Sequence, residues 1–447
     1  MAMSRYTKED IFRMVEEEDV EFIRLQFTDI FGMIKNVAVT AGQLEHVLDG
    51  GCMFDGSAIE GFVRIEESDM YLHPDLDTFE IFPWRPQQGK VARLICDVCY
   101  PNGTPFDGDP RYVLKQVLRR AKDMGYTFMV GPECEFFVFH TDEEGNPTTL
   151  THEKASYFDV GPLDFAENVR RDIVLCLEDM GFEVEASHHE LSPAQHEIDL
   201  KYREGLQTAD DITTFKMTVK NVAKRHGLHA TFMPKPQEGV NGSGMHINMS
   251  LTDHTGKNLF EDRQDKAGLS ELAYQFMAGI LYHMKEMVLL TNPLVNSYKR
   301  LIPGYDAPNY IAWSVQSNRS ALIRIPSVRG EGTRIELRCP DSSANPYLAL
   351  AACLAAGLDG IEKKMTPPAS INRNIYAMSV AEREASGIEA LPETLKEAIT
   401  AFEGSDFMRE VLGEHIFTKY LEAKKREWKA FRAHVTDWEV GEYLYKY

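Results

Sequence analysis

The sequence predicts an α+β protein of two domains, a small one over residues 1–105 and a large one over residues 106–447. Segments with helical or strand periodicity follow one another along the chain, separated by turns rich in glycine, proline and asparagine. One such turn, Pro101-Asn102-Gly103, coincides with a change of pattern near residue 105. The length of 447 residues agrees with two or three domains of roughly 100–200 residues each.

In the small domain, Thr7 can cap a helix that runs to about residue 18, and strands are expected at 20–30, at 33–39 and in further runs up to residue 100. Cys96 and Cys99 form a C-x-x-C pair within the strand-like run 91–100. No second pair completes a four-ligand set, so we expect two core residues rather than a metal or redox site. The odd number of cysteines, seven, suits a reducing compartment.

The large domain shows a rhythm of helix followed by strand. Asp109 can cap a helix with Pro110 in its first turn, and Gly125 can end it. Asp164 and Thr208 are expected to open two further helices. The other expected elements are strands at 128–140, 182–188 and 228–233, long helices at 269–290, 346–364 and 391–402, and a C-terminal pair of helices.

Charge and hydropathy exclude two classes of protein. The net charge of -21 argues against a nucleic-acid-binding protein, whose binding surface is basic. No run of about 18 apolar residues is present, so no membrane-spanning helix is expected. The first ten residues are charged and lack the apolar core of a signal peptide, so a cytoplasmic protein is expected.

Four strand-like segments carry polar side chains on one face, because residues i and i+2 of a strand point to the same side. The four sets are Glu133 with Glu135, Glu197 with Asp199, His246 with Asn248 and Ser250, and Glu336 with Arg334 and Arg338. Any one of them would fit a strand that faces solvent. Together, in apolar surroundings, they predict carboxylates that need a cation, and oxygen ligands with one histidine favour Mg²⁺ or Mn²⁺.

Arginines are concentrated between residues 300 and 338 of this acidic chain. They are Arg300, Arg319, Arg324, Arg329, Arg334 and Arg338. Guanidinium groups bind carboxylates and phosphates through paired hydrogen bonds, so this cluster beside metal ligands predicts phosphoryl transfer. The glycine-rich segment 239–244 would let the backbone approach a ligand. Neither a P-loop motif nor a dinucleotide-binding glycine motif is present, so any ATP must be held by another architecture.

Seven motifs in this order resemble those of the glutamine synthetase family, type I, and most closely its alpha subdivision. They are Met53-Phe54-Asp55-Gly56-Ser57, Gly131-Pro132-Glu133-Cys134-Glu135-Phe136, His188-His189-Glu190, Asn241-Gly242-Ser243-Gly244-Met245-His246, Asn296-Ser297-Tyr298-Lys299-Arg300, Asn318-Arg319-Ser320 and Asn345-Pro346-Tyr347. The resemblance extends from residue 6 to the C-terminus. It implies a β-grasp N-terminal domain, a catalytic domain whose strands form a funnel between subunits, and a dodecamer of two hexameric rings.

The resemblance also implies an activity. ATP and two to three Mg²⁺ or Mn²⁺ ions per active site would serve the condensation of L-glutamate and ammonia to L-glutamine through γ-glutamyl phosphate. One metal would be bound by Glu135, Glu190 and Glu197, and a second by Glu133, His246 and Glu336. ATP would contact Glu185, Ser250, Arg319, Arg324 and Arg334. Glutamate would contact Asn241, Gly242, His246, Arg300, Asp306, Arg319 and Arg338.

Four residues would take part in the chemistry, namely Asp55, Asp306, Arg319 and Arg338. Asp55 would come from the neighbouring subunit and bind ammonium. Asp306 stands in the flap, 303–308, where the family usually has glutamate, and it is shorter by one methylene. A displacement of about 1 Å can lower a rate by about 100-fold, so we expect slower ammonia chemistry or altered flap movement.

Regulation is expected from the same resemblance. Arg64 matches a residue linked to feedback inhibition by glutamine, whereas the surroundings of Tyr376 do not resemble an adenylylation site. The aromatic C-terminus, 442–447, would bind a nitrogen-responsive repressor or pack between subunits. Two alternatives remain: a glutamate–polyamine ligase of the same fold, and a non-catalytic nitrogen-sensing or assembly protein.

Overall fold

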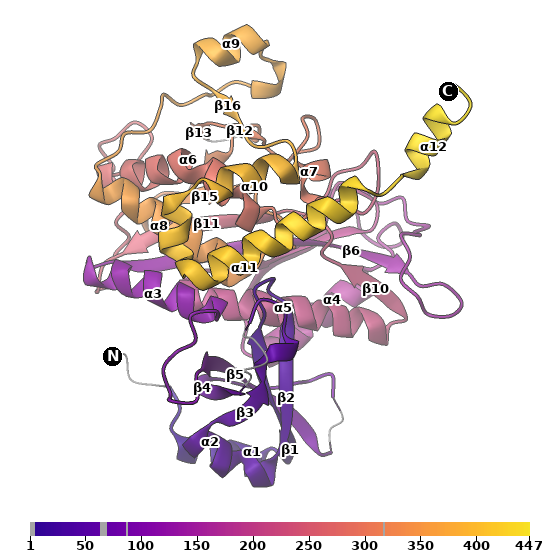
Figure 1. Ribbon diagram of the computed structural model, residues 1–447, viewed down its shortest axis with the longest axis vertical. Helices are drawn as coiled ribbons and strands as arrows, with labels where there is room; N and C mark the ends of the chain where they lie inside the picture. Colours follow the sequence, from indigo (N-terminus) through magenta and orange to yellow (C-terminus); the bar gives the residue numbers. More distant parts are fainter. Residues whose placement is uncertain (1–4, 63–68, 86–87, 316–317) are drawn as a thin grey trace.

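The computed structural model of the chain describes residues 5–62, 69–85, 88–315 and 318–447. Figure 1 shows a small sheet at the bottom, formed by the N-terminal part of the chain, and a larger sheet above it that most of the helices surround. Each sheet has its own large apolar core.

The N-terminal sheet has the strand order β2-β1-β5-β4-β3, with β1 and β5 parallel at its centre. Its strands are β1 Val20–Thr28, β2 Ile34–Thr40, β3 Cys52–Asp55, β4 Asp69–Ile81 and β5 Lys90–Cys99. Helix α1, Lys8–Glu17, is capped by Thr7 as predicted, and Asp10 completes a capping box there; α2 spans Leu44–Gly50. Cys96 and Cys99 are both buried core residues of β5, as predicted.

The large sheet has the order β13-β14-β15-β11-β6-β8-β7, and β9 and β10 also pair with β6. Its strands are β6 Thr127–His140, β7 Val184–His189, β8 Gln195–Leu200, β9 Arg203–Glu204, β10 Leu228–Thr231, β11 Met245–Thr252, β13 Trp313–Val315, β14 Ile323–Ile325 and β15 Ile335–Leu337. Strands far apart in the sequence are therefore neighbours, and β6 is the longest of them. A separate small pair joins β12, Tyr310–Ile311, to β16, Glu389–Ala390.

The helices of the large domain are α3 Pro110–Asp123, α4 Glu167–Asp179, α5 Gly205–Arg225, α6 Glu271–Thr291, α7 Ser297–Arg300, α8 Pro346–Glu362, α9 Val380–Ala385, α10 Leu395–Glu403, α11 Asp406–Arg432 and α12 Asp437–Tyr443. Asp109 caps α3 as predicted. The predicted start of a helix at Asp164 is wrong, because this carboxylate is buried and accepts a hydrogen bond from Arg170 (2.7 Å). Thr208 lies inside α5 instead of capping it, and α10 begins after Thr394, later than predicted.

Helices α6 and α8 form the centre of the large core, and glycines let them touch. A Cβ atom on Gly279 would lie 2.0 Å from the carbonyl oxygen of Ala356, and one on Gly360 would lie 2.1 Å from that of Gln275. Alanine at either position would force the two helices apart. Their close packing supports the apolar face of the sheet and leaves its other face to the polar residues.

The two domains are joined by a buried arginine. Arg111 of α3 forms ion pairs with Asp75 and Asp97 of the N-terminal sheet (both 2.7 Å) and with Asp210 of α5 (2.9 Å). The hydroxyl of Tyr347 donates a further hydrogen bond to Asp210 (2.7 Å). This network fixes how the small domain is seated on the large one.

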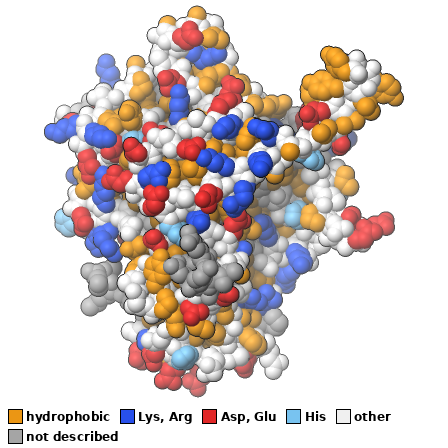
Figure 2. Space-filling model, in the orientation of Figure 1, with side chains coloured by type: hydrophobic (Ala, Val, Ile, Leu, Met, Phe, Trp, Pro, Cys, Tyr) orange, Lys and Arg blue, Asp and Glu red, His pale blue; other side chains and the backbone are white. Residues whose placement is uncertain are grey.

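The C-terminal helix α12 projects from the body of the molecule, at the upper right of Figure 1. Figure 2 shows hydrophobic side chains gathered on this projection. The exposed large ones in this region are Trp438, Val440, Tyr443, Leu444, Tyr445 and Tyr447. Within the described ranges, none of the helices is both long enough and apolar enough to cross a membrane.

Candidate functional site

The polar strand faces predicted from the sequence lie next to one another in the large sheet. Glu133 of β6 pairs with His246 of β11 on one side and with Asp199 of β8 on the other. Across these strands, Glu135 pairs with Glu197. The alternating residues of β11 are buried in the core, so the polar set faces away from it. The sheet thus brings carboxylates from separate segments to one surface.

Glu133, His246 and Glu336 form one compact cluster whose ligand atoms lie within 4.8 Å of one another. The Nδ1 atom of His246 lies 3.0 Å from Oε2 of Glu133 and 3.8 Å from Oε1 of Glu336. Burial by itself raises the pKa of Glu133, but the hydrogen bond and charge of His246 outweigh it and lower that pKa to about 2. The carboxylate of Glu133 is therefore ionised and available to a cation.

The second predicted set, Glu135, Glu190 and Glu197, lines one cavity of about 90 Å³. Burial and the charge of Glu135 raise the pKa of Glu190 to about 7. Burial and the charges of Glu135 and Asp199 raise the pKa of Glu197 far above its ordinary value. These carboxyl groups cannot all be ionised unless a cation lies among them.

Two further groups join this set that the sequence reasoning left out of the ligand list. His188 lies 3.5 Å from Oε1 of Glu190, and His188, Glu197 and Asp199 have ligand atoms within 4.8 Å. Burial raises the pKa of Asp199 to about 6. The sequence predicted Asp199 on the same polar strand face as Glu197, but the metal-ligand sets implied by the family resemblance did not include it. The sequence analysis named His188 only as part of the motif His188-His189-Glu190.

The arginines of the site contact either polar side chains or backbone carbonyl groups. Arg324 and Arg338 both pair with the fully buried carboxylate of Glu336, and the Arg338 distance is 2.6 Å. Arg334 donates from Nε to Oδ1 of Asn248 (2.9 Å). Arg300 is buried and donates to the carbonyl oxygen of Cys339 (2.7 Å). The site therefore holds positive charge directly behind a predicted metal ligand.

Two cavities meet at Glu133, which lines both of them. The smaller, of about 90 Å³, is lined by the carboxylates of Glu133, Glu135, Glu190 and Glu197 and by Asn241, Gly242, His246, Arg300, Asp306, Arg319, Arg324 and Arg338. The larger, of about 320 Å³, holds Glu185, Ser250, Asn248 and Arg334. The residues predicted for glutamate thus lie on one side of Glu133. Three of the five predicted for ATP lie on the other side, and Arg319 and Arg324 line the smaller cavity.

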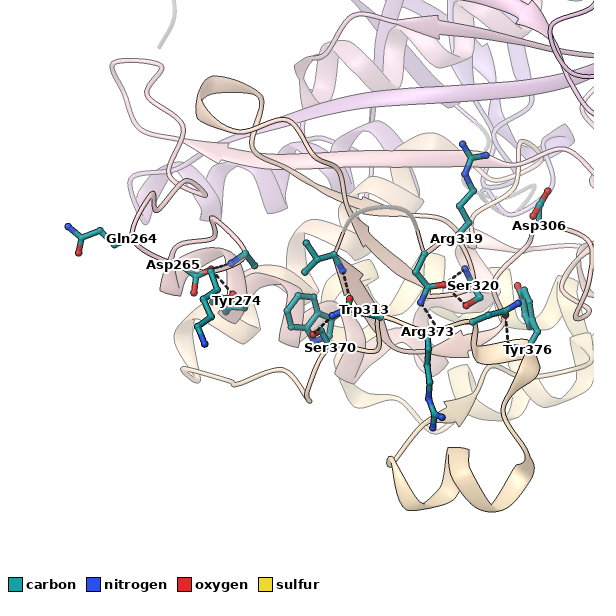
Figure 3. A pocket seen from close by; sticks show the side chains of 16 residues that line it. Gln264, Asp265, Tyr274, Asp306, Trp313, Arg319, Ser320, Ser370, Arg373 and Tyr376 are labelled. Carbon is teal, nitrogen blue, oxygen red and sulfur yellow. Dashed lines mark hydrogen bonds between the residues drawn. The ribbon is translucent and has the colours of Figure 1, made fainter.

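A third, open groove of about 1170 Å³ adjoins the smaller cavity, and Asp306 and Arg319 line both (Figure 3). Asp306 is exposed and has a left-handed backbone with φ of 52°. Its Oδ2 atom accepts a hydrogen bond from Nδ2 of Asn241 (3.2 Å). The flap residue therefore stands at the mouth of the smaller cavity.

Asp55 lies away from these cavities in its own chain. It is exposed at the end of β3, where its carboxylate accepts hydrogen bonds from the backbone N–H (2.8 Å) and the hydroxyl (2.6 Å) of Ser57. Arg64 falls outside the described residues.

A buried charged cluster lies beside Glu190, which follows β7, and beside β8, which carries Glu197. It contains Glu153, Asp164, Arg170, His189 and His196. Glu153 accepts from Nε2 of His189 (2.7 Å), and the Nδ1 atom of His189 lies 2.6 Å from the carbonyl oxygen of Glu190. Both ring nitrogens face acceptors, so the ring carries two protons, and with Arg170 it balances the two carboxylates.

Comparisons with known proteins give the family. The model of the glutamine synthetase catalytic domain matches residues 107–443, and that of the glutamine synthetase beta-Grasp domain matches residues 19–101. The chain belongs to the glutamine synthetase family. The expected fold, a β-grasp domain followed by the catalytic domain of this family, is confirmed.

The chain aligns with two relatives over the whole length of each. A glutamine synthetase of Clostridium saccharobutylicum is 61% identical over 445 residues, and one of Staphylococcus aureus (strain Mu50) is 57% identical over 449 residues; each alignment covers 100% of both chains. A solved structure titled as a GmaS/ADP complex is 34% identical with a TM-score of 0.89, covering 97% of this chain and 99% of that one. Apo GmaS superposes with a TM-score of 0.87.

Proposed function

We propose that the chain is a glutamate–ammonia ligase, which uses ATP to join ammonia to the side-chain carboxylate of L-glutamate through γ-glutamyl phosphate. The observation that carries this proposal is the position of Glu133 between two cavities. One cavity is rich in arginines and carboxylates, and the other contains three of the five residues expected to bind the nucleotide. The names of the relatives that are 57–61% identical support the same activity.

We propose that ATP lies in the larger cavity against Glu185, Ser250 and Arg334, with its phosphates directed past Glu133 toward Arg319 and Arg324 in the smaller cavity. Arg300, Arg338, Asn241, Gly242 and His246 would hold glutamate in the smaller cavity. Transfer between two anions requires positive charge around the moving phosphoryl group, and the arginines supply part of it. The neighbouring structure titled as an ADP complex supports a nucleotide site in this fold.

The donor set fits hard divalent cations. Six groups offer carboxylate oxygen or imidazole nitrogen, namely Glu133, Glu135, Glu190, Glu197, His246 and Glu336. Burial, and after it the charge of Glu135, raises the pKa of Glu190 to about 7, and a divalent cation beside these carboxylates would favour their ionised form. We propose that two to three Mg²⁺ or Mn²⁺ ions bind here, where they would neutralise charge on the phosphates.

The proposed acceptor chemistry requires a proton acceptor, because ammonium has no lone pair. Asp306 lines the smaller cavity at its mouth, and in this proposal it would take that proton while the flap around it excludes water from the acyl phosphate. Asp55 of a neighbouring subunit would bind the ammonium ion, and its exposure at the end of β3 is compatible with that.

We also propose the assembly and regulation expected from the sequence. The chain would form a dodecamer of two hexameric rings in the cytoplasm, with the strands of the large sheet lining a funnel between subunits. The exposed aromatic side chains of the C-terminal projection would be covered there by another subunit or by a nitrogen-responsive repressor. The alpha subdivision, glutamine feedback through Arg64, the absence of adenylylation at Tyr376 and the domain limits of 1–105 and 106–447 are part of the same proposal.

The experiment measures ATP-dependent phosphate release with glutamate and Mg²⁺ or Mn²⁺, using ammonium, putrescine or no acceptor, together with the glutamine formed. Ammonium-dependent glutamine formation is expected, and Glu133→Gln should abolish it while the matched exposed variant Glu143→Gln leaves it unchanged. Release only with putrescine would make the chain an amine ligase. If no phosphate is released with any acceptor, the non-catalytic alternative remains.

A further inference from the structure

The flap, residues 303–308, is held from two sides by side chains distant in the sequence. Nδ2 of Asn241 donates to the carboxylate of Asp306 (3.2 Å). On the other side, the hydroxyl of Tyr376 donates to the carbonyl oxygen of Ala307 (3.1 Å), the residue next to Asp306. Ala307 is buried, so its carbonyl group has little access to water and depends on this partner.

Tyr376 belongs to a segment, residues 371–376, that we call the strap. The side chain of Asn318 holds the strap by donating to the carbonyl oxygens of Ile371 (2.7 Å) and Arg373 (2.9 Å). The hydroxyl of Ser320 accepts from the backbone N–H of Ile375 (2.8 Å). Asn318, Ser320 and Tyr376 line the same groove, in which Figure 3 labels Ser320 and Tyr376.

Asn318 and Ser320 stand on either side of Arg319, and Ser320 also donates to Oδ1 of Asn318 (2.6 Å). Arg319 lines the smaller cavity and was predicted to bind phosphate. The turn that carries Arg319 is therefore bonded to the strap at both of its flanks. These hydrogen bonds to the backbone of the strap fix the position of the turn relative to the strap.

The strap itself is firmly seated. Ile375 is fully buried in a small apolar cluster with Ala312, Ala321 and Met378. The side-chain oxygen of Asn372 accepts from the backbone N–H of Val315 (3.0 Å) and from the hydroxyl of Ser314 (3.0 Å). The strap is thus a fixed base from which the Tyr376 hydroxyl reaches the flap.

We propose that Tyr376 is a positioning residue that holds the flap over the smaller cavity, and that the strap couples closure of the flap to the phosphate contact of Arg319. This inference rests on the proposed ligase function. It assigns Tyr376 no contact with the reacting atoms. The hydrogen bond from Tyr376 to Ala307 would keep Asp306 at the mouth of the cavity. It would thereby exclude water from the acyl phosphate until ammonia reacts with it.

The test replaces Tyr376 by phenylalanine, which keeps the ring and removes only the hydroxyl. The measured quantity is the ratio of acceptor-free phosphate release to ammonium-dependent glutamine formation at saturating ATP and glutamate. One neutral hydrogen bond changes an equilibrium by roughly threefold to tenfold, so Tyr376→Phe should raise this ratio by about that factor. The KM for ATP should change less than about twofold, because the nucleotide cavity is untouched.

The matched control is Tyr310→Phe. Tyr310 lies in the same aromatic group, with its ring 6.2 Å from that of Tyr376, but it stacks on Arg383 rather than reaching the flap. Its ratio should equal that of the wild type. Asn318→Asp is a second variant, which loses the two donations to the strap but keeps the acceptor for Ser320, and it should raise both the ratio and the KM for ATP.

A lower thermal midpoint of Tyr376→Phe with an unchanged ratio would show a merely structural role and overturn the inference. An equal rise of the ratio in Tyr310→Phe would also overturn it. If Tyr376→Phe does not fold, the ratio of acceptor-free phosphate release to glutamine formation in Asn318→Asp tests the inference instead. A wild-type chain that forms no glutamine would instead refute the proposed function, so the two failures are distinguishable.

Discussion

Replacing Asp306 by asparagine isolates the charge of the flap residue from its shape. The left-handed backbone at this position, with φ of 52°, is tolerated by asparagine as readily as by aspartate. The amide oxygen of asparagine can still accept the hydrogen bond from Asn241. The variant should therefore close its flap normally and bind ATP and glutamate with little change.

Asp306→Asn loses the negative charge of the carboxylate and, with it, the ability to accept a proton. Proton transfer by a positioned side chain contributes about 10²- to 10⁴-fold to a rate, which corresponds to about 3–5 kcal/mol of the barrier. We therefore expect the ammonium-dependent turnover to fall by at least about 100-fold, with KM values for ATP and glutamate within about threefold. Glutamine formation is measured while ammonium is varied at saturating ATP and glutamate. A turnover within threefold of the wild type would refute the assignment of the proton acceptor.

Asp306→Glu then tests the departure from the family pattern. The longer side chain reaches further, but glutamate lacks the tolerance of aspartate for a left-handed backbone, which costs ordinary residues about 1–2 kcal/mol. That amount changes the closed fraction of a flap by about fivefold or more. We expect altered ammonia turnover and acceptor-free phosphate release, and unchanged kinetics would show that the missing methylene has no consequence.

Three further predictions concern buried charges. Glu336→Gln removes a proposed ligand and leaves Arg338 buried without its carboxylate, so Mn²⁺ affinity measured by titration should fall at least about tenfold, whereas the exposed Glu143→Gln should bind normally. Arg111→Met leaves three carboxylates without their partner and should lower the free energy of unfolding by about 3–5 kcal/mol, measured by thermal unfolding. The control is Arg120→Met, which breaks the exposed ion pair of Arg120 with Glu362 and should cost less than about 1 kcal/mol. Burial raises the pKa of Asp211 from 3.8 to about 7, so its stabilising contribution is complete below about pH 4 and is lost as pH rises through 7, by about 1.4 kcal/mol per unit. Between pH 5.5 and 7.5 the wild type should lose more stability than Asp211→Asn, and parallel losses would contradict that pKa.

Local structure was predictable where neighbouring residues decide it. The capping box at Thr7 and the cap at Asp109 follow from side chains that bond the adjacent backbone, and both are present. The prediction of a helix start at Asp164 failed for a tertiary reason. Its carboxylate accepts a hydrogen bond from Arg170, six residues further on. Arg170 is itself buried and bonded to His196.

The chemical character of the site was also readable from the sequence. Alternating polar residues in otherwise apolar strands indicated a cation site, and clustered arginines indicated an anionic substrate. Both indications are local properties of residue type and spacing.

What the sequence by itself determined is therefore the inventory: the elements, their caps, the polar strand faces and the resemblance that named the family. The tertiary structure decided which strands are neighbours, and so placed Glu133 between His246 and Asp199 and at the meeting point of two cavities. It also decided the left-handed backbone of Asp306 and the hydrogen bond from Tyr376 to Ala307, 69 residues away. Strand order and long-range hydrogen bonds depend on how whole faces pack together, and no local pattern of residues contains that information.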